Sequence, residues 1–100
     1  MRIRNLVMML LVLVVSTPAL AGSVTAGKAK SGTCAGCHGP MGKSVNPQWP
    51  HLAGQQEAYL AKQLRDFRDG NRQDPVMSPM AAPLSDQDIE DLAAFFASLK

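Results

Sequence analysis

The sequence has 100 residues, and this length allows one domain but excludes folds such as a barrel enzyme of roughly 250 residues. The formal net charge of +2 is too small for the strongly basic face that nucleic-acid-binding proteins usually show, so we expect no nucleic-acid partner. Two cysteines are too few for a disulfide-dense scaffold.

Residues 1–21 have the three parts of a secretory signal peptide. Two arginines are followed by an apolar run and a small-x-small cleavage sequence: Arg2 and Arg4, residues 6–15, and Ala19-Leu20-Ala21. The run is half as long as the roughly 20 residues that cross a membrane, so we expect cleavage after Ala21 rather than retention as an anchor. The sequence thus predicts export to the periplasm and a single mature domain, residues 22–100, with no transmembrane span.

The predicted mature chain is small and has few aromatic residues for a core. It is formally neutral, with eight Lys and Arg residues against eight Asp and Glu residues, because Arg2 and Arg4 leave with the signal peptide. Domains of this size often need a disulfide, a metal or another covalent or bound group for stability. We therefore expect a bound group to complete the core, and the chain without it to be largely unfolded.

Three helices are predicted along the mature chain. The first covers about residues 24–35 and contains Gly27, a residue that allows another element to approach closely. The second covers about 55–69, where one apolar stripe and a following Gly70 mark a helix and its end; the stripe is Leu60, Leu64 and Phe67.

The last predicted helix, about residues 86–99, has the clearest start. Ser85 is a favourable N-cap, and Asp88 stands where the acidic partner of a capping box is expected. Apolar residues recur at helical spacing after it: Ile89, Leu92, Phe96 and Leu99. The segments between the helices are rich in proline, which disfavours central strands, so the predicted fold class is all-α.

Cys34-Ala35-Gly36-Cys37-His38 is the chemical centre of the sequence. A redox-active dithiol would need a surrounding strand–helix–strand pattern, which is missing here, and a zinc site would need His51 as a fourth ligand. The spacing instead is typical of covalent haem attachment, in which the two thiols bind the porphyrin and the histidine binds the iron. We predict one haem c held by Cys34 and Cys37, with His38 as an iron ligand.

The second axial ligand has several candidates. Met41 is close to the attachment segment, and we expect it to be a loop residue that cannot reach the opposite side of the haem. His51 would give a bis-histidine haem. Met77 and Met80 lie together in a proline-rich segment before the last helix, which leaves both open as ligands.

Beyond the attachment motif, the sequence resembles the class I c-type cytochromes, in particular one domain of a cytochrome c4 or a cytochrome c553 of the c5-like type. The similarity extends over the stretches Trp49–Gln55, Tyr59–Phe67, Gly70-x-Arg72, Met77-x-x-Met80 and Leu84–Asp88. It implies a small fold of three main helices and loops around one haem, with the first and last helices in contact at Gly27.

The resemblance also assigns roles to individual residues. It implies that Met77 is the axial methionine, with Met80 as the alternative. It implies that the Pro47 carbonyl, or alternatively that of Pro50, accepts a hydrogen bond from the axial imidazole. Trp49 is predicted to contact the cofactor.

An iron with both axial positions filled suits one-electron exchange better than substrate binding. We therefore expect an electron carrier rather than an enzyme, with no catalytic residues. Its expected partners are redox proteins, with a respiratory complex or dehydrogenase as donor and a terminal oxidase or reductase as acceptor. The alternatives are the haem subunit of a larger redox enzyme and a small haem peroxidase or sensor.

Overall fold

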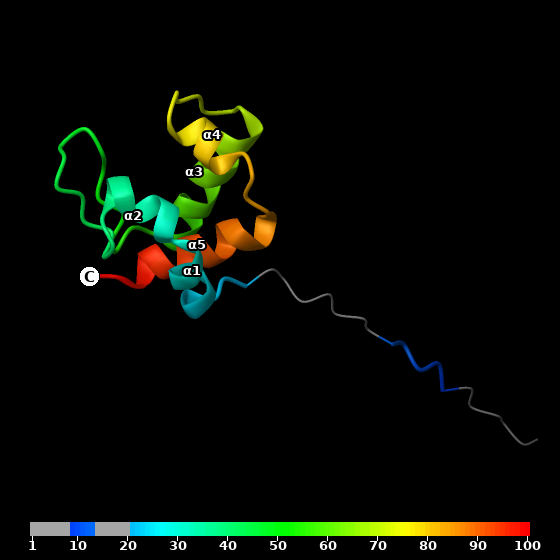
Figure 1. Ribbon diagram of the computed structural model, residues 1–100. Coiled ribbons are helices and arrows are strands. Elements are labelled where there is room, and N and C mark those ends of the chain that lie inside the picture. The colour runs from blue at the N-terminus through cyan, green and yellow to red at the C-terminus, as the bar shows by residue number, and fades with distance from the viewer. Residues whose placement is uncertain (1–8, 14–20) are drawn as a thin grey trace, which may run out of the picture.

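The computed structural model describes residues 9–13 and 21–100, so most of the predicted signal peptide lies outside the described residues. Within these ranges the secondary structure is helical and contains no strand, which confirms the all-α prediction. None of the helices described is long and apolar enough to cross a membrane. Figure 1 shows the helices in chain order: α1 (Val24–Lys30), α2 (Gly32–His38), α3 (Glu57–Asp69), α4 (Met77–Ala81) and α5 (Asp86–Ser98).

The first and last helices cross in close contact, as the family resemblance implied. Gly27 is buried on α1, and a Cβ built on it would overlap the Asp91 backbone carbonyl of α5 and lie 2.7 Å from the Phe95 Cβ. Only a residue without a side chain fits at this crossing. The contact brings the two ends of the domain together (Figure 1).

Asp91 joins these two helices by a buried set of polar contacts. Its side chain is almost fully buried, and its carboxylate accepts hydrogen bonds from the Ser23 backbone N–H at 2.9 Å and the Lys30 Nζ at 2.6 Å. The Gln87 amide donates to it at 2.8 Å. The Lys30 ammonium, followed by the Ser23 and Gln87 hydrogen bonds, lowers the pKa of Asp91 to about 2.

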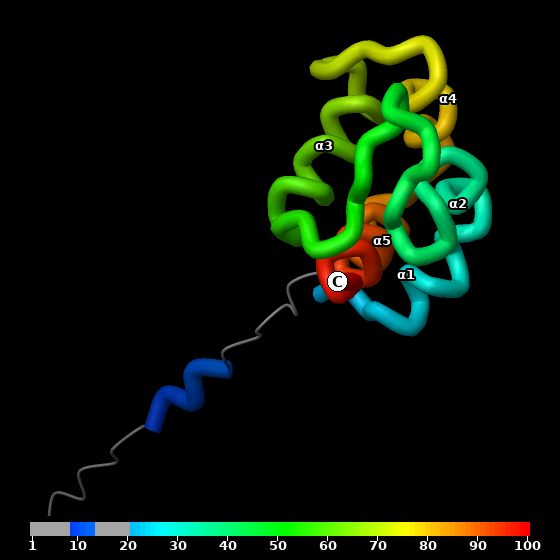
Figure 2. The backbone as a smooth tube through the Cα atoms, turned by 90° about the vertical axis from the view of Figure 1, so that its left-hand side faces the viewer, coloured from blue at the N-terminus to red at the C-terminus, as the bar shows by residue number. Residues whose placement is uncertain are grey.

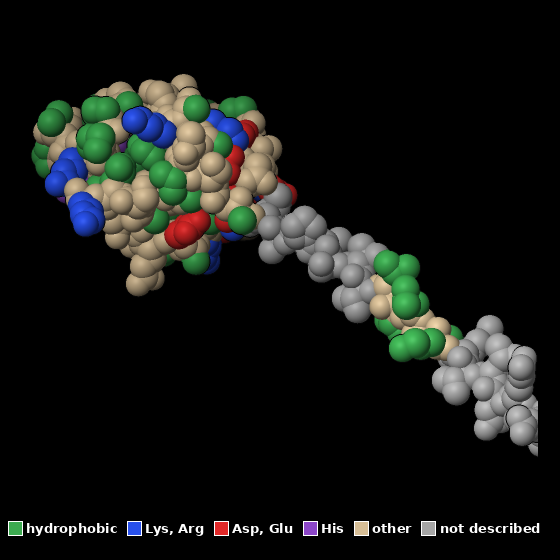
Figure 3. All heavy atoms as spheres, turned by 90° about the horizontal axis from the view of Figure 1, so that it is seen from below, with side chains coloured by type: hydrophobic (Ala, Val, Ile, Leu, Met, Phe, Trp, Pro, Cys, Tyr) green, Lys and Arg blue, Asp and Glu red, His purple; other side chains and the backbone are tan. Residues whose placement is uncertain are grey.

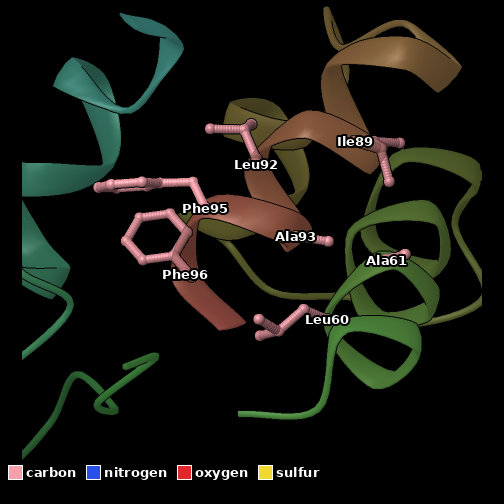
Figure 4. Packing of buried hydrophobic residues seen from close by; sticks show 7 residues of the cluster. All are labelled: Leu60, Ala61, Ile89, Leu92, Ala93, Phe95 and Phe96. Carbon is pink, nitrogen blue, oxygen red and sulfur yellow. The ribbon is translucent and has the colours of Figure 1, made fainter. Parts of the chain in front are cut away.

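The hydrophobic core is the contact between α3 and α5. Figure 4 shows Leu60 and Ala61 of α3 with five residues of α5: Ile89, Leu92, Ala93, Phe95 and Phe96. Ser85 begins α5 with the predicted capping box, in which its hydroxyl accepts from the Asp88 N–H and the Asp88 carboxylate accepts from the Ser85 N–H. The apolar periodicity and the cap therefore place α5 at the centre of the fold.

Two elements differ from the three predicted helices. The predicted helix 24–35 is interrupted at Ser31, whose N–H and hydroxyl both turn back to the Lys28 carbonyl, so that a second helix, α2, begins at Gly32. The segment of Met77 and Met80, expected to be a loop, forms the short helix α4. Pro79 is tolerated there because it stands in the first turn, where backbone N–H groups have no partner within the helix.

Replacing Gly27 with alanine should destabilise the domain. The added Cβ would meet the Asp91 backbone, which cannot move without separating α1 from α5, and forcing atoms into a packed contact costs about 1–3 kcal/mol. Gly32→Ala is the matched control, since nothing lies within 4 Å of a Cβ there. Thermal denaturation should show a lower Tm for Gly27→Ala and an unchanged or higher Tm for Gly32→Ala. Equal Tm values would contradict the close contact.

The Asp91 carboxylate should make the stability of the fold depend on pH in the acidic range. Its folded pKa of about 2 is below the unfolded value of ~3.9, so the ionised side chain stabilises the fold above pH ~4. This stabilisation is lost as the pH falls from about 4 to about 2. Asp91→Asn should therefore lower the Tm at pH 6, and its difference from the unsubstituted protein should shrink at pH 2.5.

Asp69→Asn provides the surface control, because Asp69 is half exposed and its ion pair with Arg68 joins neighbouring residues. It should change the Tm little at either pH. A Tm difference for Asp91→Asn that stays the same at both pH values would contradict this role of the carboxylate.

Candidate functional site

The short helix α2 carries the three residues of the attachment motif. Cys34 and Cys37 are one helical turn apart, partly buried and not joined in a disulfide. His38 is the last residue of the helix and is buried. The chain leaves α2 through Gly39, which has a φ of 82° that favours glycine and allows an immediate change of direction. The two thiols and the imidazole are thus fixed on one short, rigid element.

The burial of Cys34 disfavours a redox dithiol of the thioredoxin type. It raises the pKa of the Cys34 thiol above its usual value, as the largest of several effects. Reactive dithiols instead have a cysteine whose pKa is lowered to stabilise the thiolate. Together with the absence of strands in the described part of the chain, this disfavours the redox dithiol.

The imidazole of His38 is oriented by a backbone carbonyl. Its Nδ1 lies 2.8 Å from the Pro50 oxygen. A carbonyl oxygen can only accept, so Nδ1 carries the proton and donates it. Nε2 is then the nitrogen with a free lone pair, which is the state that a metal-binding histidine needs.

The expectation that Pro47 supplies this carbonyl is wrong. Pro47 is the second residue of a turn closed by the Trp49 N–H and the Asn46 carbonyl at 3.0 Å, a position at which proline is favoured. The chain reaches His38 only after this turn, at Pro50. The alternative acceptor, Pro50, is therefore the one that the structure shows.

A cavity of about 540 Å³ opens beside these residues. In the view of Figure 2, the loop between α2 and α3 runs in front, with α3 on one side, α2 on the other and α4 above. Side chains with nitrogen or sulphur atoms that could bind a metal or a cofactor line the cavity: Cys34, Cys37, His38, Met77 and Met80. Other lining residues are mostly apolar and include Trp49, Pro50, Leu60, Leu64, Phe67, Leu92 and Phe96. Its volume is within the range of roughly 300–1,000 Å³ of small-molecule and cofactor sites.

Both candidate methionines line the cavity from α4. Met77 and Met80 are three residues apart and so share one side of the helix; Met77 is partly buried and Met80 is 41% exposed. The start of α4 is fixed by Asp74, whose carboxylate accepts from the Val76 and Met77 N–H groups at 2.9 and 2.8 Å. These two hydrogen bonds lower the pKa of Asp74. Met77 is therefore the less exposed of the two thioethers, and its backbone is fixed at the start of α4.

The other candidate ligands do not line this cavity. Met41 is 60% exposed, as a loop residue should be, and the exposed ring of His51 accepts a hydrogen bond from the Ser44 N–H at 2.8 Å. In residues 9–13 and 21–100, no three His, Cys, Asp or Glu side chains are grouped as metal ligands. The geometry thus gives no support to the zinc site with His51 or to a bis-histidine iron.

Arg72 is a cavity residue whose place the sequence analysis did not predict. Among the lysines and arginines that the structure describes, it alone lines the cavity. Its guanidinium lies 4.5 Å from the centre of the Phe67 ring and donates to the Gln63 side-chain oxygen at 2.7 Å. The sequence did carry one signal for a role of Arg72: the Gly70-x-Arg72 motif directly follows a helix with an apolar stripe.

The cavity residues fit a covalently attached haem. They offer two free thiols on one helix, an imidazole with an available Nε2, a thioether on a separate helix and largely apolar walls. Arg72 adds one positive charge, which suits a porphyrin that carries carboxylates; Asp74, which also lines the cavity, has its carboxylate bound by the Val76 and Met77 N–H groups. No other prosthetic group combines an apolar ring, a metal and two sites of thiol attachment in this way.

Comparisons with known proteins agree with this donor set. The family described as "Cytochrome c" matches residues 24–100. The chain is 51% identical over 78 residues to a cytochrome c4 of Thiocapsa roseopersicina, covering 77% of this chain and 40% of that protein. It is 44% identical over 81 residues to cytochrome c-554(548) of Halomonas halodenitrificans, covering 78% of this chain and 98% of the relative.

A solved structure shows the same fold. Reduced recombinant cytochrome c4 from Pseudomonas stutzeri superimposes with a TM-score of 0.77 at 46% identity, over 80% of this chain and 47% of the other. The chain thus spans less than half the length of each of these two cytochrome c4 proteins.

Proposed function

Because this chain belongs to the cytochrome c family, whose members carry covalently bound haem c, we propose that it is a one-electron carrier with His38 and Met77 as axial ligands. Cys34 and Cys37 hold the haem through thioether bonds in this proposal. When bound, the haem supplies an iron that gains and loses one electron. The observation that supports the ligand pair is that His38 and Met77 line the same cavity from two different helices.

The protein's own residues hold the axial ligands in place. The Pro50 carbonyl keeps the His38 proton on Nδ1 and leaves Nε2 for the iron. Asp74 fixes the backbone of Met77 at the start of α4. A soft thioether ligand and an apolar shell both favour the reduced iron and raise its potential. With two protein ligands in place there is no open position for substrate, which favours a carrier over an enzyme, a peroxidase or a sensor.

The partners in this proposal are redox proteins that meet the carrier briefly. We infer a donor such as a respiratory complex or dehydrogenase and an acceptor such as a terminal oxidase or reductase. On the face shown in Figure 3, Lys and Arg side chains lie in separate places among neutral ones rather than in one basic patch. Electron-transfer contacts of this kind are usually small and short-lived.

Residues 1–21 are proposed to direct this domain, residues 22–100, to the periplasm. Covalent haem attachment of this kind takes place outside the bacterial cytoplasm, and the pattern of residues 1–21 is that of a secretory signal.

Carbon monoxide tests the proposed function. The reduced holoprotein should bind it little at neutral pH, because Met77 fills the position that the gas would take. Met77→Ala should open that position, bind carbon monoxide rapidly and lose the absorption of sulphur-ligated ferric iron. Difference absorption spectra of the reduced proteins, with and without the gas, measure the first effect, and absorption spectra of the oxidised proteins measure the second.

Met80→Ala is the matched control on the same side of α4. It should keep the spectrum and the low reactivity of the unsubstituted protein. An unchanged sulphur-ligand spectrum in Met77→Ala together with its loss in Met80→Ala would move the assignment to Met80. Rapid, complete binding of the gas by the unsubstituted protein would contradict the carrier proposal and favour a sensor or peroxidase.

Arg72 should raise the reduction potential through its charge. A positive group at the cavity disfavours the oxidised iron, which carries the extra positive charge. Arg72→Gln should therefore lower the midpoint potential in a redox titration, and Arg72→Lys, which keeps the charge, should lower it less. Equal potentials in all three proteins would contradict an effect of the Arg72 charge on the iron.

A further inference from the structure

The loop between α2 and α3 is closed at its base by one carbonyl. The Gly42 oxygen accepts from the Leu52 N–H at 2.8 Å and from the Ala53 N–H at 3.0 Å. Gly42 is buried with a φ of 70°, and a Cβ on it would lie 2.8 Å from the Ala53 nitrogen. The two sides of the loop are therefore held together below the segment that carries Pro50.

A second connection lies beyond this base and involves a side chain. The Ser44 backbone N–H donates to Nδ1 of His51 at 2.8 Å. On the same side of the loop, the Ser44 hydroxyl donates to the Asn46 carbonyl at 2.8 Å and accepts from the Asn46 N–H at 3.0 Å. The imidazole of His51 thus joins one side of the loop to the other.

The Pro50 carbonyl belongs to the peptide unit that joins Pro50 to His51. The proline ring fixes the φ of Pro50 near −65°, so the direction of this carbonyl is set by the two bonds that flank the peptide unit, ψ of Pro50 and φ of His51. Rotation about the second bond is limited by the His51 ring, because it would pull the ring from the Ser44 N–H. The same peptide therefore connects the Ser44–His51 and Pro50–His38 hydrogen bonds.

We propose that His51 is a positioning residue for the axial histidine: its hydrogen bond with Ser44 holds the Pro50 carbonyl against Nδ1 of His38 and so adjusts the reduction potential. This inference rests on the proposed function, since it takes His38 as the iron ligand. His51 acts through the peptide unit and does not touch the cavity.

The direction of the effect follows from the chemistry of the imidazole. A carbonyl that accepts the Nδ1 proton makes the ring more electron-rich and its other nitrogen a stronger base. A stronger base favours ferric over ferrous iron, which lowers the potential. Loosening the Pro50 carbonyl should therefore raise it.

The test compares three substitutions at position 51 in the haem-loaded protein. His51→Leu and His51→Ala remove the acceptor for the Ser44 N–H. His51→Asn keeps one, because its side-chain oxygen occupies about the place of the imidazole Nδ1. Redox titration gives the potential, proton NMR of the reduced protein gives the His38 Nδ1–H resonance, and hydrogen exchange gives the protection of the Ser44 amide.

We expect His51→Leu and His51→Ala to raise the potential by less than about 59 mV, the value that corresponds to a tenfold change in a one-electron equilibrium constant. The His38 Nδ1–H resonance should shift and the Ser44 amide should exchange faster. His51→Asn should restore all three properties. Val45→Ala is the control in the same loop, since Val45 is fully exposed, and it should leave them unchanged.

The proposal is overturned if the Ser44 amide exchanges faster in His51→Leu or His51→Ala while the potential and the His38 resonance stay as in the unsubstituted protein. It is also overturned if His51→Asn behaves like His51→Leu. Failure of the proposed function would look different, since loss of the axial methionine or of the attached haem would be seen in the spectrum of the unsubstituted protein before any substitution.

Discussion

The cavity of about 540 Å³ is the feature on which the rest of the structure depends. It lies where a domain of this size would otherwise have much of its core, and its walls are apolar side chains of α3, α4 and α5 together with the attachment helix α2. The cluster that the polypeptide packs by itself is confined to the contact of α3 and α5. A small chain with such a hollow has too little buried apolar surface to be stable, so the haem must supply the missing part.

The remaining contacts hold the donors around this space. The crossing of α1 and α5 at Gly27, with buried Asp91 beside it, fixes the start of the chain on which α2 is built. From there α2 presents the two thiols and His38, and Asp74 sets the start of α4 with Met77. The loop between α2 and α3 then reaches back to orient His38 through Pro50. Both proposed iron ligands are thus held by a hydrogen bond between a backbone group and a side chain.

The sequence predicted those parts of the fold and site that depend on local spacing. The attachment motif, the capping box of Ser85 and Asp88, and the close approach at Gly27 are each visible in a few adjacent residues or in one small residue. Local spacing did not determine which carbonyl accepts the hydrogen bond from His38. Pro47 and Pro50 are both prolines of one loop, and only the turn closed by Asn46 and Trp49 decides which carbonyl reaches the ring.

The helix α4 and the place of Arg72 were also not predicted, because neither follows from local spacing alone. A helix of five residues that contains Pro79 has too short a pattern to be predicted, although its first turn tolerates the proline. The place of Arg72 depends on how the chain leaves α3, where its N–H bonds to the Asp66 carbonyl; the Gly70-x-Arg72 motif marks this turn but not the direction of the arginine side chain.

The central claim, that the haem completes the core, is tested most directly by far-ultraviolet circular dichroism of the haem-free polypeptide of residues 22–100. The account predicts that most of the helix signal of the holoprotein is lost and that no cooperative thermal transition remains. Native helix content with cooperative melting in the absence of haem would contradict it.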